Sequence, residues 1–199
     1  GNSVIAIESS SFTANTTGSA PGNGGAIHLT GPVDITVNNS IFEQNIAASE
    51  GGALWNGSGS MIVSASTLTG NIANGNEADQ GGGAIYNLSG SLVVNGNSLI
   101  ANNEALGTSG SGGGILNDAG GFLTINSTII RSNTASRAGG GVEDNSGANT
   151  TITFMDVTLD SNTTAAMPGN GGGLHITGAG NAEFYNSRVN ANSAAREGG

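Results

Sequence analysis

A short pattern that returns along the whole chain is the strongest constraint on its fold. Two glycines lead into a small residue and an aliphatic one, as in Gly82-Gly83-Ala84-Ile85, and an apolar residue followed three positions later by asparagine ends the pattern, as in Ile100 and Asn103. Self-similarity at a period of about 20–50 residues is typical of a repeat protein. Seven asparagines mark the repeats, at intervals of 26 to 32 residues: Asn15, Asn45, Asn71, Asn103, Asn133, Asn162 and Asn192.

Within each repeat, apolar residues alternate with other residues, as in Ile35-x-Val37 and Leu123-x-Ile125. A period of two predicts a β-strand that buries one face. Glycine, serine and asparagine separate the short segments, so we expect three short strands per repeat. One such unit cannot bury its inner face alone, whereas units stacked in parallel close a common core. We therefore predict an all-β fold, a right-handed parallel β-helix (solenoid) of about seven rungs of roughly 26–32 residues, forming a single domain over residues 1–199.

Composition and charge exclude some classes of binding partner for this chain. The 199 residues include 36 glycines and only 4% aromatic residues, which suits a chain of tight corners between small strands. The formal net charge is −10 and there is no lysine, so a surface rich in phosphate is repelled. We expect no nucleic-acid partner, and no membrane insertion by this chain, because no apolar run is long enough to cross a bilayer. An export signal would have to lie outside this sequence.

Stacking of the repeats would place like residues in columns. The asparagines are expected to form a ladder in which each side-chain amide bonds to the amides above and below it. A hydroxyl column would precede the ladder, and Val157 would interrupt it: Ser10, Ser40, Ser66, Ser98, Thr128 and Ser187. The fourth repeat carries one extra residue between Val94 and Ile100, for which we expect a bulge.

The repeat also resembles a known family. Gly24-Gly25-Ala26-Ile27 together with Phe42-Glu43-Gln44-Asn45 is similar to the GGAI and FxxN repeats of the chlamydial polymorphic outer membrane proteins and of other large bacterial surface proteins. Only this repeat holds both motifs in full, and the others carry variants. The resemblance implies a right-handed β-helix in an exported protein, extracellular or at the cell surface, often as an adhesin passenger.

The residue just after the aliphatic position gives the candidate binding stripe. His28, Trp55, Tyr86 and His175 occupy this position in four repeats, with Leu116 and Glu143 in the others. Strand alternation predicts that these side chains point outward and form one exposed stripe. Two interpretations are open: a contact surface for a glycan or a host or cell-surface protein, or rings that stabilise one another or lie under a long loop.

Carboxylates are not gathered as an enzyme site requires, and we predict no catalytic residue, no enzyme activity and no cofactor. Asp160 is expected beside Arg131 as a surface ion pair, and Glu143 and Asp144 should point to opposite sides of their strand. The scattered acids Glu77, Asp79 and Asp118 would give at most a weak loop site for Ca²⁺.

The leading hypothesis is therefore a structural, extracellular or cell-surface β-solenoid that serves as a stalk, an adhesin passenger or the body of a fibre. A glycan- or protein-binding module that uses the stripe is the alternative, and a divergent polysaccharide-active enzyme is the third hypothesis. We also expect either a segment of a longer array or subunits that associate end to end into filaments, since solenoids need their terminal rungs covered.

Overall fold

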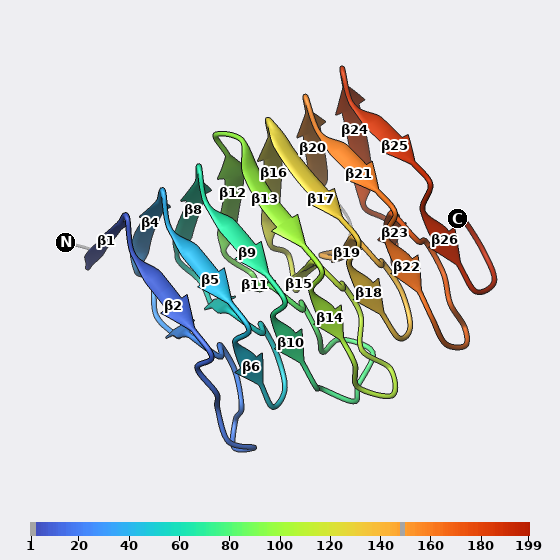
Figure 1. Cartoon of the computed structure of the whole chain (residues 1–199). Coiled ribbons are helices and arrows are strands. Elements are labelled where there is room, and N and C mark those ends of the chain that lie inside the picture. The colour runs from blue at the N-terminus through green and yellow to red at the C-terminus, as the bar shows by residue number, and fades with distance from the viewer. Residues whose placement is uncertain (1–2, 148–149) are drawn as a thin grey trace.

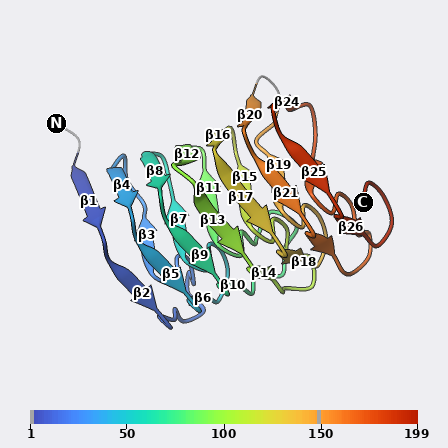
Figure 2. The same cartoon turned by 45° about the horizontal axis from the view of Figure 1, so that its top comes forward.

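The structure is a computed structural model that describes residues 3–147 and 150–199, and this part of the chain forms a parallel β-solenoid without helix (Figure 1). Four sheets run along the rod, two of seven strands and two of six. The strands make six full turns of four strands, preceded by β1 and β2. The two chain ends lie at opposite ends of the rod (Figures 1 and 2). None of the described residues belongs to a helix long and apolar enough to cross a membrane.

The two longer sheets form adjacent faces of the rod. Sheet A contains β1 (Val4–Glu8), β4 (Asp34–Asn38), β8 (Ser60–Ser64), β12 (Ser91–Asn95), β16 (Phe122–Asn126), β20 (Thr151–Met155) and β24 (Asn181–Tyr185). Sheet B contains β2 (Ser11–Thr13), β5 (Ile41–Glu43), β9 (Thr67–Thr69), β13 (Ser98–Ala101), β17 (Thr128–Arg131), β21 (Thr158–Asp160) and β25 (Arg188–Asn190).

The two six-stranded sheets complete each turn. Sheet C contains β6 (Ile46–Ala47), β10 (Ile72–Ala73), β14 (Glu104–Ala105), β18 (Thr134–Ala135), β22 (Thr163–Thr164) and β26 (Ser193–Ala194). Sheet D contains β3 (Ile27–Leu29), β7 (Leu54–Asn56), β11 (Ile85–Leu88), β15 (Ile115–Asp118), β19 (Val142–Asn145) and β23 (Leu174–Ile176). The predicted parallel β-solenoid is confirmed, but a turn has four strands where the sequence predicted three. Sheet C is the addition, because its two-residue strands are too short to show alternation.

The core is one apolar cluster that runs through the layers, built from columns of the surrounding sheets. In sheet A, Ile35 pairs with Met61, Met61 with Leu92, and Leu92 with Leu123, and all four side chains are buried. In sheet B, the column of Phe42, Leu68, Ile100, Ile130 and Leu159 is likewise buried. The predicted period of two therefore describes these strands correctly, since their other residues point away from the core.

The predicted asparagine ladder is present. The Nδ2 atom of each ladder asparagine donates to Oδ1 of the asparagine in the next layer, from Asn15 to Asn45 at 2.8 Å through to Asn162 and Asn192 at 2.9 Å. The backbone N–H of each donor residue bonds to the same Oδ1 atom. From Asn45 onward, Nδ2 also donates to a carbonyl of the preceding layer, as from Asn103 to Leu68 at 3.0 Å. From Asn45 to Asn162 the ladder thus satisfies three kinds of buried polar group: side-chain amides, backbone N–H groups and backbone carbonyls.

The hydroxyl column and the extra residue of the fourth repeat also appear. Backbone N–H groups donate to hydroxyls of the next layer, as from Ser40 to Ser66 Oγ at 3.0 Å, and Val157 interrupts the hydroxyl column as predicted. The extra residue does not bulge a strand. It lies in the turn between β12 and β13, where Gly96 and Asn97 both have positive φ, at 69° and 63°. The columns on either side of this turn keep their register.

The glycine doublets lie at the corner where sheet C gives way to sheet D. A Cβ atom on Gly83 would overlap the carbonyl oxygen of Gly113 in the next layer and the backbone of Glu104. Gly52 and Gly140 have the same kind of environment. Glycine is required here because the backbones of successive layers approach too closely for any side chain.

We predict that Asn103→Leu destabilises the rod by several kcal/mol, because each buried group left without a partner costs about 1–3 kcal/mol. The change removes partners from Asn71, Leu68 and Asn133. Asn76→Leu is the control, since Asn76 is exposed and bonds only to Thr108. Urea midpoints measured by circular dichroism should fall far more for the first variant. Equal midpoints would contradict a stabilising ladder.

Candidate functional site

The predicted stripe forms a column on the outer side of sheet D. His28 pairs with Trp55, Trp55 with Tyr86, and the column continues through Leu116 and Glu143 to His175. The prediction that the stripe is exposed is wrong for its centre: Trp55 is 6% exposed and Tyr86 is 3% exposed. His28 is exposed, and His175 is partly so. The second interpretation, rings under a loop, is the correct one for Trp55 and Tyr86.

The rings of the column stabilise one another. The Trp55 and Tyr86 rings are stacked, with centroids 6.1 Å apart and planes 3° from parallel. His28 meets the Trp55 ring edge-on at 4.4 Å. Together with Leu116 and Leu88, the two larger rings form an apolar cluster separate from the main core. The column therefore acts as a second, smaller core outside sheet D.

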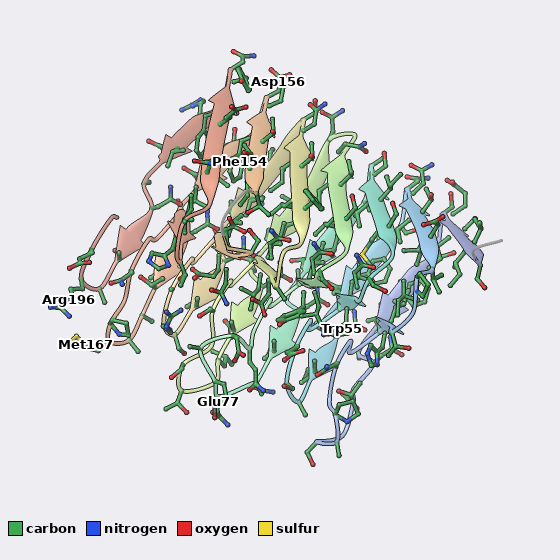
Figure 3. All side chains as sticks on the ribbon, turned by 180° about the vertical axis from the view of Figure 1, so that it is seen from behind. Trp55, Glu77, Phe154, Asp156, Met167 and Arg196 are labelled. Atoms are coloured by element: carbon green, nitrogen blue, oxygen red, sulfur yellow. The ribbon has the colours of Figure 1, made fainter. Side chains whose placement is uncertain are left out.

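Loops between sheets C and D cover this second core, and these loops together with strand β15 supply its polar contacts. Trp55 Nε1 donates to Glu50 at 2.8 Å, and the Tyr86 hydroxyl donates to the Asp118 carboxylate at 2.8 Å and to the carbonyl of Asp79 at 3.1 Å. Figure 3 shows Trp55 against the strands and Glu77 at the outer end of its loop. Sequence reasoning missed Glu50, because a loop residue five positions before the tryptophan has no periodic signal.

The enclosed polar groups have shifted ionisation. Burial raises the pKa of Glu50; the Trp55 hydrogen bond opposes that rise, and the charges of Asp79 and Asp118 add to it. Burial, followed by the nearby charges of Glu50 and Asp118, raises the pKa of Tyr86. Burial lowers the pKa of His28. Each shift disfavours the charged form, and those of Glu50 and Tyr86 are typical of groups packed under a loop.

A second polar cluster lies further along the column, around the fully buried Glu143. Its carboxylate accepts a 2.6 Å hydrogen bond from the Thr177 hydroxyl and lies 2.9 Å from His175 Nδ1. Arg137 Nη1 lies 3.7 Å from the same carboxylate and donates to Ser111 Oγ at 3.1 Å. The cluster holds a loop arginine against sheet D and so fixes the loop. Arg137 and Thr177 were not identified from the sequence.

Sheet D also carries an inward ladder that the sequence analysis missed. Asn56 donates to Asn87 and Asn87 to Asn117 at 2.7 Å, and Asn117 donates to Asp144 Oδ1 at 2.9 Å. As predicted, Glu143 and Asp144 thus lie on opposite sides of β19. Asp144 Oδ2 is buried and has no hydrogen-bond partner. The signal was present, since asparagine or aspartate lies two residues after the aliphatic in four successive repeats.

The predicted surface ion pair between Asp160 and Arg131 is not formed. Asp160 accepts hydrogen bonds from Asn190 at 2.8 Å and Ser161 at 3.1 Å, and it makes no ion pair with Arg131. The prediction of that pair is wrong, because the amide of the next layer is the nearer partner.

Asp118, one of the three acids considered for Ca²⁺, accepts hydrogen bonds from Tyr86 and Asn145. Within residues 3–147 and 150–199, no three His, Asp or Glu side chains are grouped as a metal site requires.

A pocket of ≈ 620 Å³ lies beside His28 at the N-terminal end of the stripe. The loop of residues 17–26 forms most of its wall through glycine and small side chains. His28 is the one titratable residue of this lining, so the pocket lacks the pair of carboxylates that a glycoside hydrolase uses.

The fold and its two ladders define a parallel β-solenoid repeat protein. Residues 39–57 match the family model described as the Chlamydia polymorphic membrane protein repeat. This segment contains Phe42, Asn45, the Gly51-Gly52 doublet and Leu54, so it includes both motifs of the repeat. The chain therefore resembles proteins built from repeats of this type. No curated protein and no solved structure gives a match.

We predict that Asp144→Asn raises stability by about 1 kcal/mol, because an amide adds a donor where the buried Oδ2 atom has no partner. The amides of Asn87 and Asn117 each donate to a glycine carbonyl of their own repeat as well as to the next layer. Asp34→Asn, at a less buried position, controls for the change of charge. Urea denaturation checks the result, and a lower midpoint for Asp144→Asn would contradict the inferred ladder position.

The raised pKa of Glu50 predicts the sign of a pH effect. Between the ordinary pKa of 4.5 and the raised value, the folded protein binds more protons than the unfolded chain. The contribution of Glu50 to stability is therefore fully present below pH 4.5 and is lost as pH rises through this window.

The variant Glu50→Gln should remove this pH dependence and be the more stable protein at pH 7. Urea midpoints of wild type and variant across the window give the comparison, with the exposed Glu77→Gln as the control for charge. A difference between wild type and Glu50→Gln that does not change with pH would show that Glu50 is not the group responsible.

Proposed function

We propose that this chain is the non-catalytic structural body of an extracellular or cell-surface protein, used as a stalk, adhesin passenger or fibre. The observation that carries the proposal is the continuity of the stack. The asparagine ladder connects every layer from Asn15 to Asn192, and no catalytic constellation interrupts it in the described residues. A molecule whose buried amides join similar layers by hydrogen bonds is suited to forming a long, stiff rod.

The direction of the bonds supports a mechanical role. The strands run across the rod, so the backbone bonds between layers and the ladder bonds lie along it. The chain ends are at opposite ends of the rod (Figure 1), and tension between them would act on these bonds in the direction in which they are aligned. In each layer, several bonds would then share the load, as in the two neighbouring columns at Ser40 and Asn45.

The acidic side chains support a structural role over catalysis. Glu143, Asp118 and Asp160 are each held by neighbouring side chains. Tyr86 and Trp55 belong to the second core and are not available as a platform for sugar rings. Trp55, Tyr86 and Glu143 stabilise loops on the sheet D side of the rod, and the same loops would form the surface that the stalk presents.

The surface location is supported by the match of residues 39–57 to a repeat named for membrane proteins. The acidic charge and the absence of lysine agree with a protein that avoids phosphate-rich partners.

An antibody against the folded chain should label intact cells of the source organism, and brief protease treatment of those cells should remove the label. A cytoplasmic marker, labelled only after permeabilisation, provides the control. Label that appears only in permeabilised cells would refute the surface location. Release of sugar from polysaccharide by the purified chain would refute the non-catalytic role.

A further inference from the structure

The outer face of sheet B is left bare by the fold. Figures 1 and 2 show this sheet with no other described segment drawn over it. Two columns of side chains point outward from it. The first is Ser11, Ile41, Thr67, Leu99, Ile129, Thr158 and Arg188, and the second is Thr13, Glu43, Thr69, Ala101, Arg131, Asp160 and Asn190. Ala101 is buried, and the other members are exposed or partly exposed.

The first column exposes apolar side chains on a regular sheet. Ile41 is 48% exposed and Ile129 is 46% exposed, and Leu99 lies between them, partly exposed. If the seven strands of sheet B are counted as layers from β2 onward, Ile41 lies in layer two, Leu99 in layer four and Ile129 in layer five. Thr67 separates Ile41 from the adjacent pair of Leu99 and Ile129. Exposed apolar side chains grouped on one flat face are a feature of interaction surfaces.

The second column carries an unmatched pair of opposite charges. Glu43 and Arg131 are three layers apart, about 14 Å, which is too far for direct contact. In the described part of the molecule, neither side chain has an ion pair or a hydrogen bond to another side chain. Arg131 is exposed and Glu43 is partly exposed, and they lie on the same strands as Ile129 and Ile41.

We propose that the outer face of sheet B binds a second copy of this chain, with the two rods antiparallel. The two-fold axis lies in the plane between the two copies and runs along the strand direction, midway between the layers of Thr67 and Leu99. It brings layer two of one copy opposite layer five of the other. Ile41 then packs against Ile129 of the second copy, and Glu43 meets Arg131 of the second copy. The two-fold symmetry repeats both contacts, as in an isologous interface.

The charges select this register over its neighbours. Moving the axis by half a layer toward the C-terminus brings Glu43 opposite Asp160 of the second copy, which places like charges together. Moving it by half a layer the other way brings Glu43 opposite Ala101 and Arg131 opposite Thr13, so both charges lose their partners. Matching charges and penalised alternatives are the features that specify one register in an interface.

The expected contact is small. Six overlapping layers span about 29 Å, and a face about 15 Å wide gives roughly 900 Å² of surface buried in total. Stable complexes usually bury about 1,200–2,000 Å², so we expect a weak dimer with a Kd in the micromolar range. Lateral pairing of rods does not depend on the location or role proposed above.

Analytical ultracentrifugation of the purified chain at low and high salt tests the proposal. The wild type should show a monomer–dimer equilibrium that weakens with salt, because salt screens exposed charges. Arg131→Glu and Glu43→Arg should each raise the Kd at least about tenfold by placing like charges opposite each other. The double variant Glu43→Arg with Arg131→Glu should restore the dimer.

Arg188→Glu is the matched control, because Arg188 lies on sheet B in the last layer, beyond the overlap. It should leave the Kd unchanged, and circular dichroism establishes that all variants are folded. A wild type that stays monomeric throughout, or a double variant that fails to restore the dimer, overturns the proposal. Association lost with Arg188→Glu and kept with Arg131→Glu would indicate contact at the end of the rod and would also overturn it.

Discussion

The hydrogen bond between identical asparagine amides in successive layers is the interaction on which this structure depends. Each layer offers a thin strip of apolar side chains, too little to determine its position on the next layer by hydrophobic contact alone. The amide adds direction: its Oδ1 atom takes two donors from one neighbouring layer, while Nδ2 reaches the amide and a carbonyl on either side. A layer displaced by one residue would lose all of these bonds together, so the ladder sets the register of the sheets beside it.

The same stack produces a rod with unlike sides. Sheet D holds a second core in which Trp55 and Tyr86 lie beneath loops that contribute Glu50 and the carbonyl of Asp79, while Arg137 and Glu143 fix the loop further along. Sheet B has no such cover, and its outer columns remain available for contact. The loops that stabilise the second core and the uncovered sheet that is available for contact therefore lie on different faces of the rod.

Much of the fold could be predicted from the sequence because every turn of a solenoid repeats the same pattern of short strands and corners. Spacing identified the ladder, the hydroxyl column with its interruption at Val157, and the alternating strands. The strands of sheet C escaped notice because two residues show no period, and the inner ladder ending at Asp144 was overlooked although its residues are periodic.

The site was harder to predict from the sequence than the fold. Alternation correctly placed Trp55 and Tyr86 outside the coil, but their exposure depends on loops whose conformation has no repeat. Arg131 and Asp160 are neighbours as expected, yet Asp160 bonds to Asn190, whose amide in the next layer lies closer to it than the guanidinium does.

The turn at Gly96 and Asn97 shows how such a chain can tolerate changes in length. An extra residue inside a strand would reverse which side chains face the core for the rest of that strand, whereas here it is taken up by two residues in the left-handed region. Insertions and deletions that arise at corners would thus leave both flanking columns intact. Repeats of unequal length can diverge from a common ancestor by small gains and losses of sequence, and each copy still fits the one before it.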